Sequence, residues 1–232
     1  MPVPEERLRA LEKTAAKRAT EYHVVGWNGL PPLDVLGPFA HLHTLMDADV
    51  PTGELSREPV VYEAERVLRG QERLVEQGYG LVTTLIRDQD DSPVGYTTMC
   101  VMGGDNQDVL QDNTFVLRSR RGRGLGMLSK LSNLRLLSEH HPHVRHVHTW
   151  TAEDNDAMRA VNQRLGFCPV ETMYQLERAL DRSARRGIGG GVLRRLVRDR
   201  PRPHQSGSGT RPAFSGERRP MVWPACLRGS PG

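Results

Sequence analysis

Apolar and polar residues along the first three-quarters of the chain follow two different periods. Apolar positions three to four residues apart predict amphipathic helices, whereas apolar runs and alternation predict strands. The helical pattern covers five segments, Glu5–Thr20, Leu33–Ala48, Val61–Gln77, Gly124–His140 and Asn155–Leu165. Strand patterns cover Tyr22–Trp27, Leu81–Arg87, Val94–Met102, Leu110–Leu117 and Val144–Thr151, and one or two closing strands are expected within Phe167–Glu177.

The order of these segments predicts a mixed α/β domain in which helices cover a central sheet. A leading helix precedes the first strand, and no internal repeat is found. In the segment Val144–Thr151 the apolar residues do not alternate cleanly, which favours a strand that is buried on both faces.

Composition places the chain among globular proteins. Of its 232 residues, 37% are hydrophobic and 26% are charged, so the chain is long enough to bury a core without disulfides. No apolar stretch reaches the roughly 18 residues that a membrane helix needs, and the charged N-terminus does not resemble a signal peptide. The three cysteines are widely separated, which argues against a disulfide framework. We therefore expect a cytoplasmic protein that does not contact membranes.

Charge is unevenly distributed along the chain. Residues 182–232 contain 12 arginines and two acidic residues, a net charge of +10, so the first 181 residues carry −6 of the total of +4. Gly, Pro and Ser dominate the same C-terminal segment, which predicts a disordered basic tail. We accordingly divide the chain into a leading helix (1–20), a domain (21–181) and the tail (182–232).

The segment after the strand Leu110–Leu117 is the strongest candidate for a binding site. It reads Arg121-Gly122-Arg123-Gly124-Leu125-Gly126 and leads directly into a long helix. A helix N-terminus presents unpaired N–H groups, glycines let a backbone close on an anion, and arginines bind phosphate oxygens. Neither the P-loop pattern nor the dinucleotide-binding pattern matches this segment. The alternative interpretation is a basic surface turn.

These residues resemble the signature of the GNAT superfamily of acyl-CoA N-acyltransferases, Arg/Gln-x-x-Gly-x-Gly/Ala. A second segment, Asn155–Phe167, resembles the family's Asn-x-x-Ala/Met…Leu-Gly-Phe run and follows at the usual spacing. The resemblance extends over about Tyr22–Arg178. It implies a GNAT-like fold whose central mixed sheet splays between its fourth and fifth strands, with helices on both faces.

The resemblance also implies a binding mode for acetyl-CoA as co-substrate. Pantetheine would pair with the strand backbone at Phe115, Val116 and Leu117. The pyrophosphate would rest on the N–H groups of Arg121, Gly122, Arg123, Gly124, Leu125, Gly126 and Met127. Asn155 would bind the CoA arm.

The implied reaction is direct attack of a primary amine, of a small molecule or a peptide, on the thioester. For the general base we favour Asp112, with Glu153 and His148 as alternatives. The acid that protonates the thiolate is a departure from the family, because Asn162 stands where many relatives have Tyr. Tyr174 and Tyr96 are the alternatives considered.

Two further clusters were weighed. The acidic residues Asp47, Asp49, Glu54 and Glu58, in the region expected to bind the acceptor, would suit a cationic amine, or form a solvated loop. The histidines between His140 and His148 straddle a helix–strand junction with no acidic or cysteine cluster beside them, so no metal is expected.

Two other functions compete with the enzyme. The missing Tyr motivates a non-catalytic acyl-CoA-binding module. The basic tail motivates non-specific binding of nucleic acid or another polyanion, although the tail contains no recognisable nucleic-acid motif. The sequence does not indicate an oligomeric state.

Overall fold

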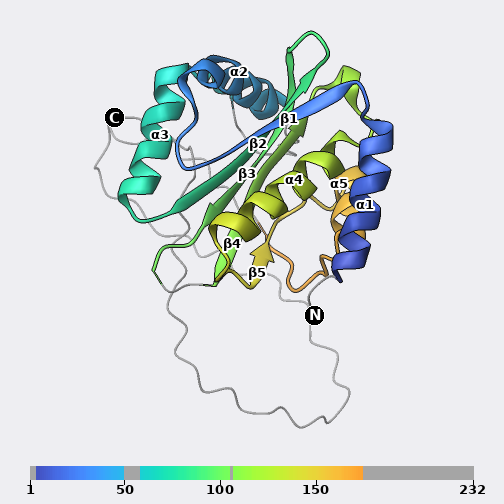
Figure 1. Cartoon of the computed structure of the whole chain (residues 1–232). Coiled ribbons are helices and arrows are strands. Elements are labelled where there is room, and N and C mark those ends of the chain that lie inside the picture. The colour runs from blue at the N-terminus through green and yellow to red at the C-terminus, as the bar shows by residue number, and fades with distance from the viewer. Residues whose placement is uncertain (1–3, 50–57, 105–106, 175–232) are drawn as a thin grey trace, which may run out of the picture. The chain divides into compact units, whose positions relative to one another are not determined.

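The computed structural model describes residues 4–49, 58–104 and 107–174. Its strands form one mixed sheet in the order β1-β2-β3-β4-β5 (Figure 1). All neighbours pair antiparallel except β4 and β5, which pair parallel. The strands are β1 (Tyr22–Asn28), β2 (Gly80–Asp88), β3 (Pro93–Val101), β4 (Asp108–Val116) and β5 (His146–His148).

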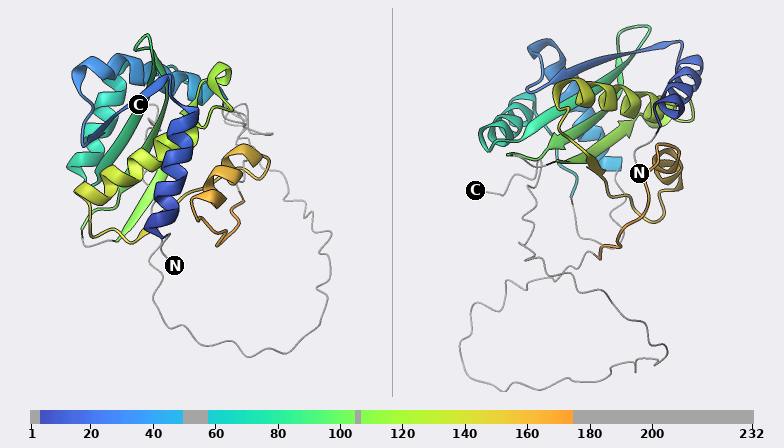
Figure 2. Two further views of the ribbon diagram at one scale, coloured as in Figure 1. Left: turned by 45° about the vertical axis from the view of Figure 1, so that its right-hand side comes forward. Right: turned by 60° about the horizontal axis from the view of Figure 1, so that its bottom comes forward.

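Helices cover both faces of this sheet, as predicted (Figures 1 and 2). They are α1 (Glu5–Arg18), α2 (Leu33–Asp49), α3 (Ala64–Glu76), α4 (Leu125–His140) and α5 (Asp156–Arg164), with a short 3₁₀ helix η1 (Arg118–Arg120) before α4. None of the helices within the described ranges is long and apolar enough to cross a membrane.

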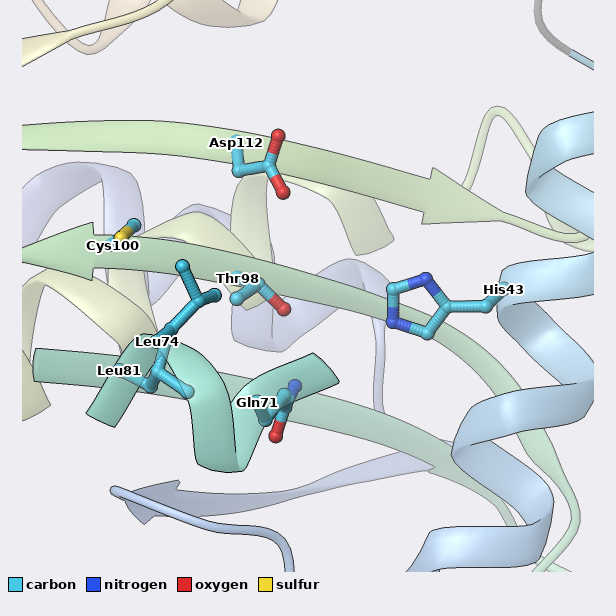
Figure 3. A pocket seen from close by; sticks show the side chains of 7 residues that line it. All are labelled: His43, Gln71, Leu74, Leu81, Thr98, Cys100 and Asp112. Atoms are coloured by element: carbon cyan, nitrogen blue, oxygen red, sulfur yellow. The ribbon is translucent and has the colours of Figure 1, made fainter. Parts of the chain in front are cut away.

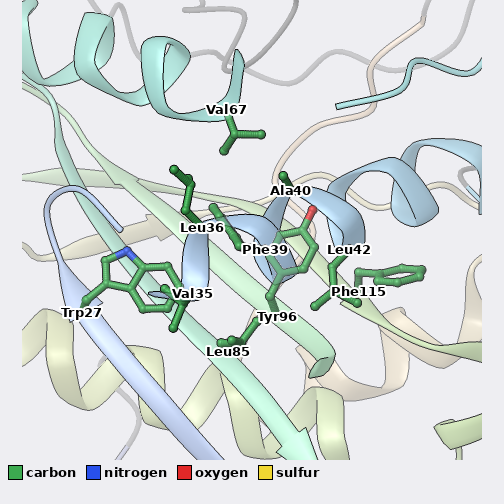
Figure 4. Packing of buried hydrophobic residues seen from close by; sticks show 10 residues of the cluster. All are labelled: Trp27, Val35, Leu36, Phe39, Ala40, Leu42, Val67, Leu85, Tyr96 and Phe115. Carbon is green, nitrogen blue, oxygen red and sulfur yellow. The ribbon is translucent and has the colours of Figure 1, made fainter. Parts of the chain in front are cut away.

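The α2 face of the sheet holds an aromatic core (Figure 4). Phe39 of α2 meets Trp27 of β1 and Tyr96 of β3 edge to face, with ring centroids 5.5 and 5.2 Å apart. Phe115 of β4 packs in the same cluster. This packing places the middle of β3 and the end of β4 in fixed positions under α2.

The opposite face packs against α4. Leu137 of α4 joins Val82, Met99 and Val109 of three successive strands in one buried cluster. Asn133, fully buried, donates through Nδ2 to the carbonyl of Val82 at 3.1 Å. Because α4 is held along its length, its N-terminus has a fixed position beside the end of β4.

The leading helix α1 packs on α4 and α5. Ala15 lies in a cluster with Met127, Leu131 and Leu165. Arg7 donates through Nη2 to the carbonyl of Arg164 at 2.9 Å, at the C-terminal end of α5. Helix α1 therefore packs against both the helix that follows the candidate binding segment and the helix that Asn155 caps.

Two strand predictions are wrong. The fifth strand is shorter than Val144–Thr151, and it is not buried on both faces, because His146 and His148 are exposed. It pairs only with β4, so in the described part of the chain it lies at the edge of the sheet. The closing strands are absent from Phe167–Tyr174, the part of that segment that the structure describes. The predicted disorder of 182–232 concerns residues outside the described ranges.

Candidate functional site

Strands β4 and β5 pair over a short distance and then separate. Pairing joins β5 to β4 only from Asp108 to Leu110, and the hydroxyl of Thr149 then donates to the carbonyl of Gln111 at 3.2 Å. Strand β4 continues to Val116, paired on its other side with β3. Within the described ranges, the final part of β4 therefore has one edge without a strand partner, as the predicted splay requires.

Backbone direction selects the residue that faces this open edge. The N–H of Leu117 donates to the carbonyl of Val94 at 2.9 Å, so Leu117 faces β3, and so does Phe115 two residues earlier. Val116 faces the other way, and its carbonyl accepts a hydrogen bond from Nε of Arg121 at 2.9 Å. Of the three residues predicted to bind pantetheine, only Val116 directs its backbone to the open edge.

The predicted phosphate-binding segment forms the turn before α4. Gly122 and Gly124 have φ of +79° and +82°, which favour glycine. The first helical hydrogen bond runs from the N–H of Leu128 to the carbonyl of Gly124, at 3.0 Å. The N–H groups of Leu125, Gly126 and Met127 precede that bond, as at any helix N-terminus. The N–H of Arg121, which the sequence also predicted to bind the pyrophosphate, instead donates to the carbonyl of Arg118 at 3.3 Å. The candidate anion site is therefore formed by the N–H groups at the start of α4.

The arginines of this segment are held by carboxylates that the sequence analysis did not connect with them. Asp49, the last residue of α2, bonds both Arg118 and Arg121. Burial works to raise the pKa of Asp49, but the hydrogen bonds and charges of the two arginines outweigh it and hold that pKa below its usual value. Helix α2 is therefore tied directly to the candidate phosphate segment.

The other acidic residues considered for an acceptor have different positions. Asp47 accepts a hydrogen bond from the N–H of Val60 at 2.8 Å, so this carboxylate fixes the chain that leads into α3. Glu58 is exposed. Glu54 lies outside the described residues.

Asn155 caps α5. Its Oδ1 accepts a hydrogen bond from the N–H of Met158 at 3.1 Å, which satisfies one free donor of the first turn. The side-chain amide nitrogen is the group that this arrangement leaves for another partner.

Asp112 lines a small pocket on the α2 and α3 face of the sheet (Figure 3). Asp112 lies two residues after Leu110, the last residue of β4 that pairs with β5, and thus at the point where β4 and β5 separate. The cavity volume is about 10 Å³, roughly what one water molecule needs. The other lining residues are His43, Gln71, Leu74, Leu81, Thr98 and Cys100.

Two residues of this lining each carry a buried polar atom without a partner in the described structure, Nε2 of His43 and Oε1 of Gln71. Nδ1 of His43 is 3.1 Å from the hydroxyl of Tyr96. Burial lowers the pKa of His43 to about 3, so its ring is neutral. Because buried polar atoms are nearly always hydrogen-bonded, these atoms indicate a site for a polar group or water beside Asp112.

The candidates for the acid are separated by the structure. Tyr96 is fully buried, and burial together with the nearby charge of Asp112 raises its pKa well above the usual value. Tyr174 is 85% exposed, in a segment without secondary structure. Asn162 is buried on α5 and donates through Nδ2 to the hydroxyl of Thr151 at 3.0 Å.

The alternative bases lie away from the pocket. His148 contacts Asp108 with an Nε2–Oδ1 distance of 3.4 Å, and His146 contacts the same oxygen at 3.1 Å. Glu153 is exposed before α5. Among the residues that the structure describes, no set of three metal-ligating side chains has the geometry to hold a metal ion.

Lys130, which is 2% exposed, is a buried cation that was not predicted from the sequence. It lies on α4, near the ring of Phe167, with 5.8 Å between Nζ and the ring centroid. A lysine within the apolar stripe of a helix was the available signal.

Comparison with solved structures identifies proteins of similar fold. One is a tandem GNAT protein from the clavulanic acid biosynthesis pathway, 32% identical over 64% of this chain, with a TM-score of 0.49; the match spans only 42% of that protein. Another is the aminoglycoside N-acetyltransferase AAC(6')-Iy in complex with CoA, 18% identical over 68% of this chain and 95% of that one, with a TM-score of 0.48.

A third is a protein of Pyrococcus furiosus described as an acetyl transferase. It is 15% identical, the match covers 68% of this chain and all of that one, and the TM-score is 0.50. No protein-family profile and no curated protein matches the chain. The open mixed sheet, with β4 and β5 parallel and then diverging, is the fold that the resemblance to the GNAT superfamily predicted.

Proposed function

We propose that this chain, which has the GNAT fold, is an acetyl-CoA-dependent N-acetyltransferase that transfers an acetyl group to a primary amine. The observation that carries the proposal is the course of β4. Its open edge, where the backbone of Val116 faces outward, leads directly to the free N–H groups at the start of α4. The open strand edge can pair with the amides of pantetheine, and the N–H groups at the start of α4 can bind a pyrophosphate.

Both substrates would meet where β4 and β5 separate. The N–H of Val116 faces the open edge and would donate to the thioester oxygen as it gains negative charge. The amine would approach from the α2 and α3 face, where Asp112 lines the pocket. Holding the two reactants in this order supplies much of the acceleration, because the reaction becomes effectively intramolecular.

Asp112 would take the proton that the acceptor loses. Its carboxylate lies at the separation of the strands, beside a space of one water molecule whose lining includes two residues that each carry an unpaired polar atom. A carboxylate can act there directly or through the water. Its charge also favours binding of the acceptor in the cationic form in which amines occur at neutral pH.

The test is a thermal-shift titration of the full chain with acetyl-CoA, CoA and ATP. A ligand that binds only the folded state stabilises it by about 2.7 kcal/mol at 100 times its Kd. We expect stabilisation by both CoA species and not by ATP, and loss of that stabilisation in Arg121→Ala. Arg145→Ala is the matched control, because this exposed arginine bonds the carbonyl of Pro142, away from the segment before α4.

Turnover is then measured as release of free thiol from acetyl-CoA with a panel of primary amines. Thiol release that requires an amine and is lost in Asp112→Asn supports the enzyme. Stabilisation by CoA with no turnover on any amine would instead favour an acyl-CoA-binding module. Absence of stabilisation by either CoA species would refute the proposed function.

A further inference from the structure

Lys130 is a buried cation for which the proposed function has no role so far. Its side chain is 2% exposed, and the ring of Phe167 lies 5.8 Å from its Nζ. Within the described structure, no carboxylate forms an ion pair with it, and burial is the only cause that lowers its pKa, to about 8. Burial of an unpaired ammonium group is costly, so a lysine here calls for an explanation beyond packing.

The position of Lys130 on α4 directs it to the gap between β4 and β5. Leu137, seven residues later on the same face of the helix, packs with Val109 of β4 and Val147 of β5, where those strands are paired. Lys130 lies about 10 Å closer to the start of α4. Helix α4 runs antiparallel to β4, so a residue nearer the start of α4 lies beside a later residue of β4. A displacement of about 10 Å corresponds to about three residues of β4 after Val109, which is beyond Leu110, the last residue of β4 that pairs with β5.

The α5 side of this gap offers no acid. Phe167 donates its N–H to the carbonyl of Asn162 at 3.0 Å, so Lys130 and Asn162 share Phe167 as a neighbour. Asn162 stands where the resemblance places a tyrosine, and its buried Oδ1 has no partner in the described structure. An amide cannot supply a proton at neutral pH.

Other charged groups on the elements packed against α4 are engaged elsewhere. Glu12 of α1 bonds Arg135 on another face of α4, at 2.5 Å, and Glu5 approaches the same arginine at 3.5 Å. Arg7 bonds a carbonyl at the end of α5. Asp108 contacts His146 and His148 at the paired end of β4 and β5.

The buried polar side chains that β4 and α5 contribute on this side of the sheet are uncharged. The buried polar side chain of β4 is Gln111, and that of α5 is Asn162. Asp112 faces the opposite side of the sheet, toward α2 and α3. A proton donor and a proton acceptor would thus stand on the two sides of the gap.

We propose that the ammonium group of Lys130 donates a proton to the sulfur of CoA as it departs. This inference rests on the proposed function. The amine nitrogen attacks the thioester carbon, the C–N bond forms, and the C–S bond breaks with its electron pair going to sulfur. Sulfur takes a proton from Nζ, which becomes a neutral amine and regains a proton from solvent. Before this attack the acceptor, bound as an ammonium ion, loses one proton to Asp112, and its nitrogen loses a second proton to water as the amide forms. Asp112 returns its proton to solvent, so each transfer releases one proton in total and needs no further reactant.

The acidity of Lys130 suits this transfer. A pKa of about 8 lies close to that of a thiol, about 8.5, so the proton moves between groups of similar affinity. An ordinary surface lysine, with a pKa of about 10.4, would be a weaker donor.

The test is Lys130→Met in the full chain, since methionine keeps most of the side-chain volume. We expect kcat for amine-dependent thiol release to fall by about 100-fold or more, with the Kd for CoA within about twofold of wild type. The alkaline decline of kcat, which reports deprotonation of the donor, should disappear. Thermal unfolding should occur at the same or a higher temperature, because the variant no longer buries a charge.

Two further variants complete the test. Lys13→Met removes an exposed lysine of α1 and should leave kcat and the pH profile unchanged. Lys130→Arg keeps a charge that does not deprotonate near neutral pH, and it should remain as slow as Lys130→Met. Recovery of kcat in Lys130→Arg would overturn proton donation by showing that charge alone is needed.

A kcat and an alkaline limb that survive in Lys130→Met would overturn the proposal while leaving the proposed function intact. If the wild-type chain itself releases no thiol with any amine, both proposals fail together. The two failures are therefore distinguished by the wild-type activity.

Discussion

Gly126 shows how one position at the start of α4 can separate stability from binding. It lies within the first turn, its φ is not positive, and a Cβ added to it would meet nothing within 4 Å. The backbone therefore tolerates any residue there. A negatively charged side chain, however, would occupy the place where phosphate is expected.

Gly126→Glu should accordingly stabilise the fold and abolish CoA binding. Replacing a helical glycine and placing a carboxylate at a helix N-terminus together contribute about 1 kcal/mol to the free energy of unfolding. The same carboxylate repels phosphate. Urea denaturation and a CoA titration measure the two effects.

Gly37→Glu is the matched control for this prediction. Gly37 also lies within a helix, α2, and a Cβ added to it would likewise meet nothing within 4 Å. This variant should leave CoA binding unchanged. No gain in stability is expected from it, because Pro38 follows and disfavours a helical residue with a Cβ at position 37. If Gly126→Glu bound CoA as tightly as wild type, the start of α4 would not be the phosphate site.

At the scale of elements, the contact between α2 and the segment before α4 is the main addition of the structure. Asp49, at the end of α2, forms ion pairs with Arg118 and Arg121, and Arg121 also donates a hydrogen bond to the carbonyl of Val116. A bound pyrophosphate would compete with Asp49 for the guanidinium of Arg121, and a pantetheine amide would compete with Arg121 for the carbonyl of Val116. Binding of CoA is therefore expected to exchange these contacts and to release the end of α2.

Asp49→Asn should then bind CoA more tightly. The loss of a competing carboxylate that is only partly buried corresponds to about 1 kcal/mol, or roughly a fivefold lower Kd. Isothermal titration with CoA at low salt measures the change. Asp34→Asn, in the exposed first turn of the same helix, is the control and should not alter the Kd. Weaker binding by Asp49→Asn would show that this carboxylate positions the arginines instead of competing with phosphate.

At the scale of the whole molecule, the buried imidazole of His43 links the aromatic core to pH. Its ring packs against Phe39 and Tyr96, with centroids 4.5 Å from each. Burial lowers its pKa to about 3 in the folded state, from 6.5 for a free side chain. The unfolded chain therefore binds one more proton than the folded chain between these two pH values.

Stability should fall as the pH decreases from 6.5 toward 3, because protonation favours the unfolded state. For one proton, the free energy of unfolding changes by up to about 1.4 kcal/mol per pH unit. Urea denaturation at a series of pH values measures the slope, and His43→Gln should reduce it. His41→Gln is the control, since this exposed neighbour on α2 should leave the slope unchanged. An equal slope in wild type and His43→Gln would contradict the assignment to His43.

Local pattern was sufficient for the elements and for the segment that precedes α4. The periods of apolar residues placed the helices and the first four strands, because each period reflects which face of an element is buried. The glycines and arginines around Arg121 identified a candidate phosphate site, because helix N-termini and glycine backbones bind anions wherever they occur. These inferences need only neighbouring residues.

Local pattern failed where solvent exposure depended on neighbours distant in sequence. The fifth strand was predicted too long and doubly buried, since its irregular pattern of apolar residues could not show that β5 lies at the edge of the described sheet. The closing strands after Gly166 were wrong within the described residues, where Val170, Met173 and Tyr174 are exposed and form no secondary structure.

The sequence by itself determined the fold class and identified a candidate anion-binding segment and Asp112 as a candidate base. Only the tertiary structure decided that Val116 is the residue whose backbone faces the open edge, that Asp49 holds Arg121, and that Lys130 is buried. The reason is physical. Secondary structure and anion binding arise from interactions along a few residues, whereas burial, ion pairing and the pKa of a lysine depend on which distant elements pack around it.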